Sequence, residues 1–350
     1  MSPQSIRSVV VTAPSRLHFG MFSFGQASVR QYGGVGAMIE SPGVRVSFRP
    51  AEHFAIAGLH AERAGRFAEQ IVAGLRQNGG LSSNEGELSG VLEIQHAPRE
   101  HIGLGLGTQL GLSIAAAICA ACGLPRAPAA ELARLAGRGK RSAIGTHGFD
   151  RGGLLVEAGK RTADEISPLL ARLDLPAAWR FLLIMPRRET GLAGTDEQQA
   201  FLRLPAVPLS TTDRLLREAM LHLLPAAAMG DFREFSASLY RFGHLAGTCF
   251  ARQQGGPYAD ERTAGLVRQL RQMDIEGVGQ TSWGPTVFAL FQSEDEARRR
   301  LPEVQACLAE VSAAGDGNEY ECIVTAPANQ GATIACSSRP STWAASAGTR

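Results

Sequence analysis

Several short stretches of the chain alternate between hydrophobic and polar residues, and this period of two predicts β-strands. Residues 15–20 are the clearest case, because the alternation places Arg16 and His18 on one face of a strand and hydrophobic residues on the other. Residues 9–12 are mostly hydrophobic and lead into this stretch, and residues 44–48 alternate again. The chain is therefore expected to begin with strands, one of which presents Arg16 and His18 together.

The remainder of the first half mixes helices with one more strand. Hydrophobic residues recur at helical spacing over residues 64–75, and the glycines of residues 78–80 would end that helix. Residues 90–96 read as a strand, and residues 108–122 form a long run of small and hydrophobic residues that stops at Gly123. Such a run predicts a helix that is buried on all sides.

The second half has a different order of elements, which begins with a hydrophobic strand over residues 179–185 and ends with a strand over residues 320–325. Between them we expect three helices within residues 210–273, strands over 276–280 and 286–291, and a helix that begins after Ser293. This order is an elaborated β-α-β-β-α-β layer, the ferredoxin-like pattern.

A chain of 350 residues is longer than a single hydrophobic core usually organises, which favours two domains. We expect an N-terminal domain over residues 1–178 and a C-terminal domain over residues 179–325. Residues 326–350 are rich in Ala, Ser, Thr, Gly and Pro without periodicity, so we expect a disordered tail there.

Composition narrows the class of protein. The hydrophobic fraction is 44%, the charged fraction 19% and the net charge only +2, which favours a soluble protein with small-molecule partners over one that binds nucleic acid or an anionic membrane. The longest hydrophobic run, residues 114–124, is too short to span a bilayer, and residues 1–8 lack the core of a signal peptide. Six cysteines without dense spacing favour reduced thiols, so we expect a cytoplasmic protein.

Lysine is almost absent from the chain, since Lys140 and Lys160 are the only two. Codon bias toward Arg, Ala and Gly is the simplest cause. Even so, any phosphate bound here must be held by arginine, glycine-rich backbone, a helix N-terminus or a metal.

Three glycine-rich segments are candidates for chemistry. Gly103-Leu-Gly-Leu-Gly107 comes directly before the buried helix, where backbone amides and the helix dipole suit a phosphate, although such a turn also occurs without any ligand. Residues 137–153 contain Arg141 and Ser142 and are either an exposed loop or a binding segment. Residues 277–286 join two strands and carry Gln280, Ser282 and Trp283, which could face a ligand, although packing is the ordinary role of a tryptophan.

The residues of these segments and their order along the chain resemble the sequence motifs of the GHMP small-molecule kinase superfamily. Its three blocks are an Ala-Pro strand, a phosphate loop that opens a helix, and a glycine-rich C-terminal block, and they correspond here to residues 13–20, 98–109 and 277–290. Within the superfamily the chain is similar to the β-ribofuranosylaminobenzene 5'-phosphate synthases of methanopterin biosynthesis. That similarity covers about residues 9 to 325 and rests on residues 15–20, 32–36, 103–109, 141–145, 191–194 with Glu197, and 280–285.

The resemblance implies a fold and a reaction. The fold is α+β and GHMP-kinase-like, with an N-terminal domain similar to domain 2 of ribosomal protein S5, a ferredoxin-like C-terminal domain and the site between them. The reaction is phosphoribosyl transfer from 5-phosphoribosyl 1-pyrophosphate to 4-hydroxybenzoate or 4-aminobenzoate, with release of carbon dioxide and pyrophosphate and with Mg²⁺ as cofactor. The sequence leaves open whether the arene carries OH or NH₂, and a homodimer is compatible with the resemblance.

The candidate site residues follow from the motifs. Arg16 and His18 are the candidates for aromatic-acid recognition or proton handling. The candidates for substrate binding are Gly34, Gly103, Gly105, Gly107, Thr108, Gln109, Arg141, Ser142, Gln280, Ser282 and Trp283. The metal ligands are undetermined, with Glu197 as the one candidate.

Two other functions compete with this interpretation. The first is a GHMP-type kinase that uses ATP on a small alcohol, for which Asp150 is the acid we would consider as the base. Against it, Thr108 and Gln109 replace the two small residues that follow the loop glycine in the kinases, as they do in the synthases. The second is a ligand-binding regulator that kept the fold without catalysis.

Overall fold

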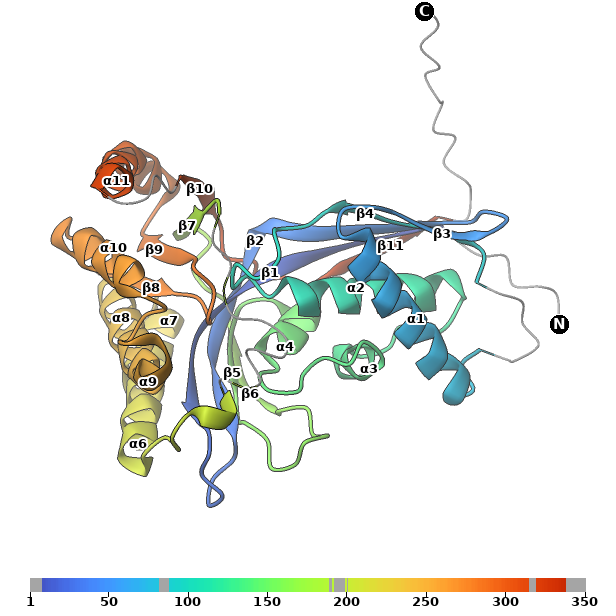
Figure 1. Ribbon diagram of the computed structural model, residues 1–350, viewed down its shortest axis with the longest axis horizontal. Helices are drawn as coiled ribbons and strands as arrows, with labels where there is room; N and C mark the ends of the chain where they lie inside the picture. Colours follow the sequence, from blue (N-terminus) through green and yellow to red (C-terminus); the bar gives the residue numbers. More distant parts are fainter. Residues whose placement is uncertain are drawn as a thin grey trace, which may run out of the picture.

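The computed structural model describes residues 8–81, 88–188, 191, 199, 201–314 and 319–337. The strands of this part of the chain form two β-sheets, with helices packed beside each (Figure 1). The sheet nearer the N-terminus contains seven strands: β1 (Ser8–Ser23), β2 (Tyr32–Arg49), β3 (Phe54–Gly58), β4 (Gly90–His96), β5 (Leu154–Glu157), β6 (Leu169–Leu173) and β11 (Thr333–Ser337). Its main order is β11-β1-β2-β4-β3, while β5 pairs with β2 and with β6.

The helices of the first half lie on one side of this sheet (Figure 1). They are α1 (Ala61–Gln77), α2 (Leu106–Ala121), α3 (Ala129–Leu135) and α4 (Ile144–Arg151). Helix α2 contacts both long strands and is buried along most of its length, as its run of small hydrophobic residues predicts. It begins two residues earlier than predicted, at Leu106, directly inside the glycine-rich motif.

The second sheet has the ferredoxin-like order. Its strands are β7 (Arg180–Pro186), β8 (Val278–Gln280), β9 (Val287–Phe291) and β10 (Tyr320–Thr325), arranged antiparallel as β10-β7-β9-β8. The last strand therefore lies beside the first, as the β-α-β-β-α-β pattern requires. The helical segments of this half are α6 (Leu209–Glu218), the π-helical turn η1 (Ala219–Leu223), α7 (Leu224–Met229), α8 (Phe232–Thr248), α9 (Ala251–Gln254), α10 (Glu261–Gln272) and α11 (Glu294–Ala314).

The predicted disordered tail is wrong for residues 326–337. Strand β11 pairs antiparallel with β1 from Ser8 to Thr12, and Ala328 donates a backbone hydrogen bond to Met38 at 2.9 Å. The small polar residues gave no strand signal, because the backbone supplies the hydrogen bonds of a ladder and pairing with β1 needs little from the side chains. The prediction for residues 338–350 falls outside the described residues.

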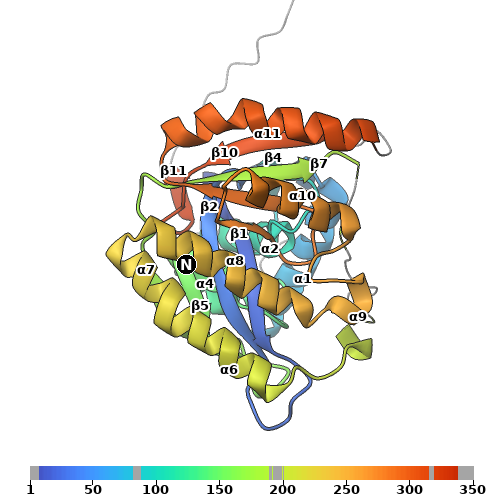
Figure 2. The ribbon, with the colours of Figure 1, turned by 90° about the vertical axis from the view of Figure 1, so that its left-hand side faces the viewer.

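The two halves share a hydrophobic core. Leu17 and Phe19, on the hydrophobic face of β1, belong to the same buried cluster as residues of β7, α8 and β9. The ring centroids of Phe19 and Phe288 are 5.5 Å apart, and α8 lies across β1 (Figure 2). The opposite face of β1, with Arg16 and His18, is thus fixed at the junction of the two sheets.

Two further observations concern the chain as a whole. No helix in the described part is long and hydrophobic enough to cross a membrane. All six cysteines lie within the described part, and none forms a disulfide bond.

Candidate active site

The phosphate-loop motif forms a tight turn at the N-terminus of α2. Gly103 and Gly105 have φ angles of 87° and 76°, a backbone region that side chains other than glycine rarely adopt. Gly105 is the N-cap, and its carbonyl oxygen accepts hydrogen bonds from the amides of Thr108 and Gln109 at 3.1 and 3.2 Å. No acidic residue lies in the first turn of the helix, so its positive dipole end is uncompensated there. The loop therefore has the backbone geometry of an anion site.

The C-terminal glycine-rich block braces this loop from the other sheet. The hydroxyl of Thr281 donates to the carbonyl of Gly103 at 3.0 Å, and the hydroxyl of Thr286 donates to the carbonyl of Ile102 at 2.6 Å. A Cβ on Gly284 would lie 2.3 Å from the amide nitrogen of Gly103, so only glycine permits this approach. Two motifs that are far apart in the sequence thus form one structural unit.

Three arginines surround the loop. The amide of Arg16 donates to the carbonyl of Leu104 at 3.0 Å, and a Cβ on Gly105 would lie 3.2 Å from Nε of Arg16. Arg63 of α1 and Arg138, in the turn after α3, both approach Gly107. Of the three, only Arg16 was predicted: Arg63 lies in no motif, and Arg138 lies in the glycine-rich segment 137–153, in which Arg141 and Ser142 were the residues named. The scarcity of lysine was the one signal that pointed to arginine.

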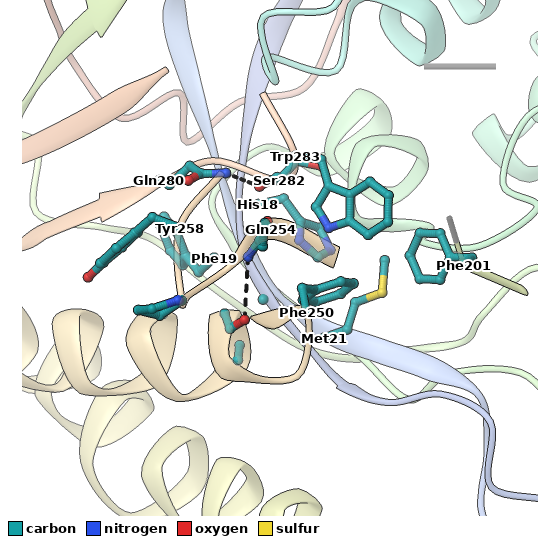
Figure 3. A pocket seen from close by; sticks show the side chains of 15 residues that line it. His18, Phe19, Met21, Phe201, Phe250, Gln254, Tyr258, Gln280, Ser282 and Trp283 are labelled. Atoms are coloured by element: carbon teal, nitrogen blue, oxygen red, sulfur yellow. Dashed lines mark hydrogen bonds between the residues drawn. The ribbon is translucent and has the colours of Figure 1, made fainter. Parts of the chain in front are cut away.

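A hydrophobic pocket opens beside the C-terminal glycine-rich block that braces the loop. It is partly open to solvent, and its walls come from β1, α8, the segment after α8 and the C-terminal glycine-rich block. Figure 3 shows its main side chains, which are His18, Phe19, Met21, Phe201, Phe250, Gln254, Tyr258, Gln280, Ser282 and Trp283. A mostly hydrophobic pocket with a few polar atoms is typical of a small aromatic ligand site.

His18 is the central polar group of this pocket. Its side chain is buried, and its backbone is fixed by Thr281, whose hydroxyl accepts from the His18 amide at 3.0 Å. Burial, reinforced by the positive charge of Arg16, holds the pKa of His18 well below its usual value of 6.5, so the imidazole is neutral near pH 7. Its Nε2 is buried without a hydrogen-bond partner among the described residues, and so is Nε1 of Trp283. Such atoms are costly unless a ligand satisfies them.

An aromatic wall closes one side of the pocket. The rings of Phe201 and Trp283 are stacked, with centroids 4.8 Å apart and an interplanar angle of 8°, and Phe250 meets Trp283 edge-on at 5.2 Å. The guanidinium of Arg141 lies over the ring of Phe201, 4.7 Å from its centroid. Arg141 therefore stands against the aromatic wall. Phe201 and Phe250 were not predicted, since isolated phenylalanines in helical segments look like core residues.

Four of the predicted substrate-binding residues are engaged by other residues of the chain, three through side-chain hydrogen bonds and one through a close backbone contact. Gln109 is fully buried, and its side-chain amide donates to the carbonyl of Gly145 at 2.8 Å. Ser142 donates to the buried carboxyl group of Glu157 at 2.6 Å. The remaining two are Gln280, which accepts from the amide of Ala259 at 2.7 Å and donates to the carbonyl of Ser282 at 3.0 Å, and Gly34, where a Cβ would lie 2.2 Å from the carbonyl oxygen of Gly20.

Of the two acidic candidates, only Asp150 lies in the described part of the chain. Asp150 accepts from the amide of Ala129 at 2.9 Å, at the start of α3, and so serves as a helix cap. Glu197 lies outside the described residues. Within the described part, no three His, Cys, Asp or Glu side chains come close enough together to hold a metal ion.

Comparisons with known proteins agree with this architecture. Residues 219–310 match the family model described as GHMP kinases C terminal. The chain is 28% identical to the β-ribofuranosylphenol 5'-phosphate synthase of Archaeoglobus fulgidus, over 92% of this chain and 97% of that protein. It is 27% identical to the protein of the same name from Methanothermobacter thermautotrophicus, over 93% of this chain and 98% of that protein.

Solved structures show the same fold at low sequence identity. A homoserine kinase from Cytophaga hutchinsonii superposes with a TM-score of 0.61 and 17% identity, covering 96% of this chain and 99% of that one. Mevalonate-3-kinase from Thermoplasma acidophilum gives 0.62 and 14%, with the same coverage of both chains. The chain therefore has the GHMP kinase fold, and the resemblance seen in its motifs is confirmed.

Proposed function

We propose that this chain transfers the phosphoribosyl group of 5-phosphoribosyl 1-pyrophosphate to 4-hydroxybenzoate, with release of carbon dioxide and pyrophosphate. The product would be β-ribofuranosylphenol 5'-phosphate, which places the reaction early in methanopterin biosynthesis. The names of the relatives and their nearly full-length similarity support this activity. The carrying observation in the structure is that Arg16 borders an anion loop, that His18, two residues further along β1, lines a hydrophobic pocket, and that Thr281 is bonded to both the loop and His18.

This arrangement can hold both substrates next to each other. The pyrophosphate of the donor fits the loop at residues 103–107, and the arene fits the pocket. Arg16 and His18 are two residues apart on a strand, a separation of roughly 6.6 Å, which is close to the span of a para-substituted benzoate. The arene would direct its carboxylate to Arg16, where an arginine fork can bind it, and its para substituent to His18.

The two unpartnered nitrogens favour a hydroxyl as that substituent. In the tautomer protonated at Nδ1, Nε2 of neutral His18 accepts a hydrogen bond, whereas Nε1 of Trp283 only donates one. A phenolic hydroxyl can donate to the first and accept from the second. An aromatic amine can donate to His18, but its lone pair is delocalised into the ring and is a poor acceptor for Trp283. We therefore propose 4-hydroxybenzoate as the preferred arene.

The chemistry follows from the placement of charge. The bond between C1' and the pyrophosphate oxygen breaks, and its electron pair leaves with pyrophosphate toward the arginines and the N-terminus of α2. The ring carbon that bears the carboxylate forms a bond to C1', while His18 Nε2 takes the phenolic proton and so increases the electron density of the ring. The bond to the carboxylate then breaks, carbon dioxide leaves, and its electron pair restores the aromatic ring. His18 finally returns the proton to the phenolate.

The aromatic wall has a second role in this scheme, because water would hydrolyse the activated sugar. Phe201, Phe250 and Trp283 surround the pocket where the arene must stand against C1'. Excluding water there favours attack by the ring carbon.

We propose magnesium as part of the bound donor. Magnesium commonly reaches phosphate sites with one or two carboxylates and the phosphate oxygens of the substrate as ligands, without a protein cage. When bound, the ion would neutralise charge on the departing pyrophosphate. We further propose a cytoplasmic enzyme that forms a homodimer, which size-exclusion chromatography with light scattering would test.

One assay separates this proposal from the kinase alternative. The purified protein is given the sugar donor, magnesium and carboxyl-labelled 4-hydroxybenzoate, and labelled carbon dioxide and pyrophosphate are measured together. We expect the two products in equal amounts, and a lower rate with 4-aminobenzoate. Phosphorylation of an alcohol by ATP, or label retained in a ribosylated product, would refute the proposed reaction. Binding of both substrates without turnover would favour the regulator.

A further inference from the structure

Two guanidinium groups meet over a single glycine of the phosphate loop. A Cβ built on Gly107 would lie 2.5 Å from Nη2 of Arg63 and 3.2 Å from Nη2 of Arg138. Arg63 comes from α1 and Arg138 from the turn after α3, so separate elements direct like charges to one point. Both side chains are half-buried, which screens their repulsion less than full exposure would.

One of these two guanidinium groups is paired with a carboxylate. Glu100 forms an ion pair with Nη1 of Arg63 at 3.1 Å, and His60 and His101 lie 3.4 and 3.3 Å from its carboxyl oxygens. Partial burial by itself would raise the pKa of Glu100, but Arg63 and the two histidines hold it below its usual range, so the group is ionised. Glu100 therefore engages one arm of the Arg63 fork and leaves the other arm, Nη2, directed to Gly107.

The two guanidinium groups converge at the N-terminus of a helix, where the helix dipole is also positive. Gly107 is the second residue of α2, a helix of 16 residues whose N-cap offers no side-chain hydrogen bond and whose first turn has no acid. Arg16 borders the same loop at Gly105. Several cations and a helix N-terminus at one loop favour a ligand with more than one negative charge.

We infer that Arg63 and Arg138 bind the pyrophosphate leaving group of the donor, and that Glu100 is a positioning residue for Arg63. The inference rests on the proposed function, which supplies the pyrophosphate. As the bond to C1' breaks, the leaving group gains negative charge, so two guanidiniums placed there bind it more tightly in the transition state than in the ground state. Arg141, in contrast, lies against the aromatic wall and is not part of this clamp.

The direct test measures pyrophosphate itself. Isothermal titration calorimetry with magnesium pyrophosphate is carried out on the wild-type protein, Arg63→Ala and Arg138→Ala. Arg66→Ala is the matched control, since Arg66 lies on the same helix and pairs with Glu62 on the exposed surface. We expect affinity to fall 10- to 100-fold in each of the first two variants and to stay unchanged in the control. Wild-type affinity in both Arg63→Ala and Arg138→Ala would overturn the inference.

Glu100 is tested by a split between kinetic constants. Glu100→Gln removes the charge that orients Arg63, so we expect kcat to fall at least fivefold with little change in KM for the arene, and Glu100→Asp to recover part of the loss. A purely structural role would lower the melting temperature without this split, and that result would refute the positioning role.

The two proposals can fail separately. If the wild type releases no carbon dioxide but binds pyrophosphate in a manner that depends on Arg63 and Arg138, the proposed function is wrong and the clamp is retained. If the wild type catalyses the transfer and the alanine variants keep their pyrophosphate affinity, the clamp is wrong and the function is retained.

Discussion

Replacing Gly107 by alanine should weaken ligand binding without destabilising the fold. The added methyl group would lie 2.5 Å from Nη2 of Arg63, closer than real contacts of this kind, so the guanidinium has to move away from the loop. It is the end of a flexible side chain and can move at low cost to the fold. Alanine within a helix is favoured over glycine by roughly 0.5–1 kcal/mol, so the free energy of unfolding should not decrease.

The magnitude follows from the hydrogen bond that is displaced. A hydrogen bond to a charged group contributes about 1.5–3 kcal/mol, and each 1.4 kcal/mol corresponds to about tenfold in a binding constant. Gly107→Ala should therefore weaken binding of the sugar donor about 10- to 100-fold. Gly65→Ala is the matched control, because a Cβ on Gly65 would contact only Cδ1 of Ile56, at an ordinary 3.5 Å.

Calorimetry measures binding of the sugar donor, and thermal denaturation of the same samples measures the stability of the fold. Wild-type donor affinity in Gly107→Ala would refute the placement of the donor at this loop. A large drop in melting temperature would show that the position is structural and that the guanidiniums cannot be displaced cheaply.

Three further results are expected, two from substitutions of Arg16 and His18 and one from a different arene. Arg16→Lys should weaken arene binding by about 1.5–3 kcal/mol, seen as a raised KM, whereas a loss of donor affinity alone would assign Arg16 to the phosphate site. His18 should stay neutral, so the reaction rate should be maintained well below pH 6.5. Because the pKa of His18 is lower in the folded than in the unfolded protein, His18 lowers the free energy of unfolding as the pH falls through 6.5. Between pH 7.5 and 5, His18→Gln should therefore lose less stability than the wild type, which denaturation at the two pH values would measure. 3-Hydroxybenzoate should bind without turnover, since a meta hydroxyl does not increase electron density at the attacking carbon, and carbon dioxide release from it would refute the mechanism.

The elements that were predicted are those that carry a local signal, whereas β3, β5, β6, α3 and α4 were not predicted. Periodicity identified β1 and the buried helix α2, and Asp231 and Ser293 cap their helices through backbone amides three residues later, as their positions imply. The 326–337 segment failed for the opposite reason. Its pairing with β1 depends on backbone groups from a distant part of the chain, which leave no trace in local composition.

The candidate site was predictable only where its residues fall inside motifs. Arg16, His18 and Trp283 do, and the structure brings them to one pocket and its bordering loop. Arg63 lies in a segment whose periodicity describes an ordinary helix, and Arg138 lies in the glycine-rich segment 137–153, where nothing local distinguishes it from the other charged residues. Their proximity to Gly107 results from the packing of α1 and α3 against α2, which is a tertiary property.

The same packing explains why motif residues such as Gln109 and Ser142 support the site from behind. A loop that presents backbone amides to an anion needs its own carbonyls and its neighbouring helix starts held in place. Gln109 ties the beginning of α2 to Gly145 of α4, and Ser142 joins the start of α4 to the buried Glu157 of β5. A residue can therefore belong to a binding motif because it fixes the backbone that binds, so exchanging Gln109 for the small residue of a kinase would remove its hydrogen bond to Gly145 and alter the loop.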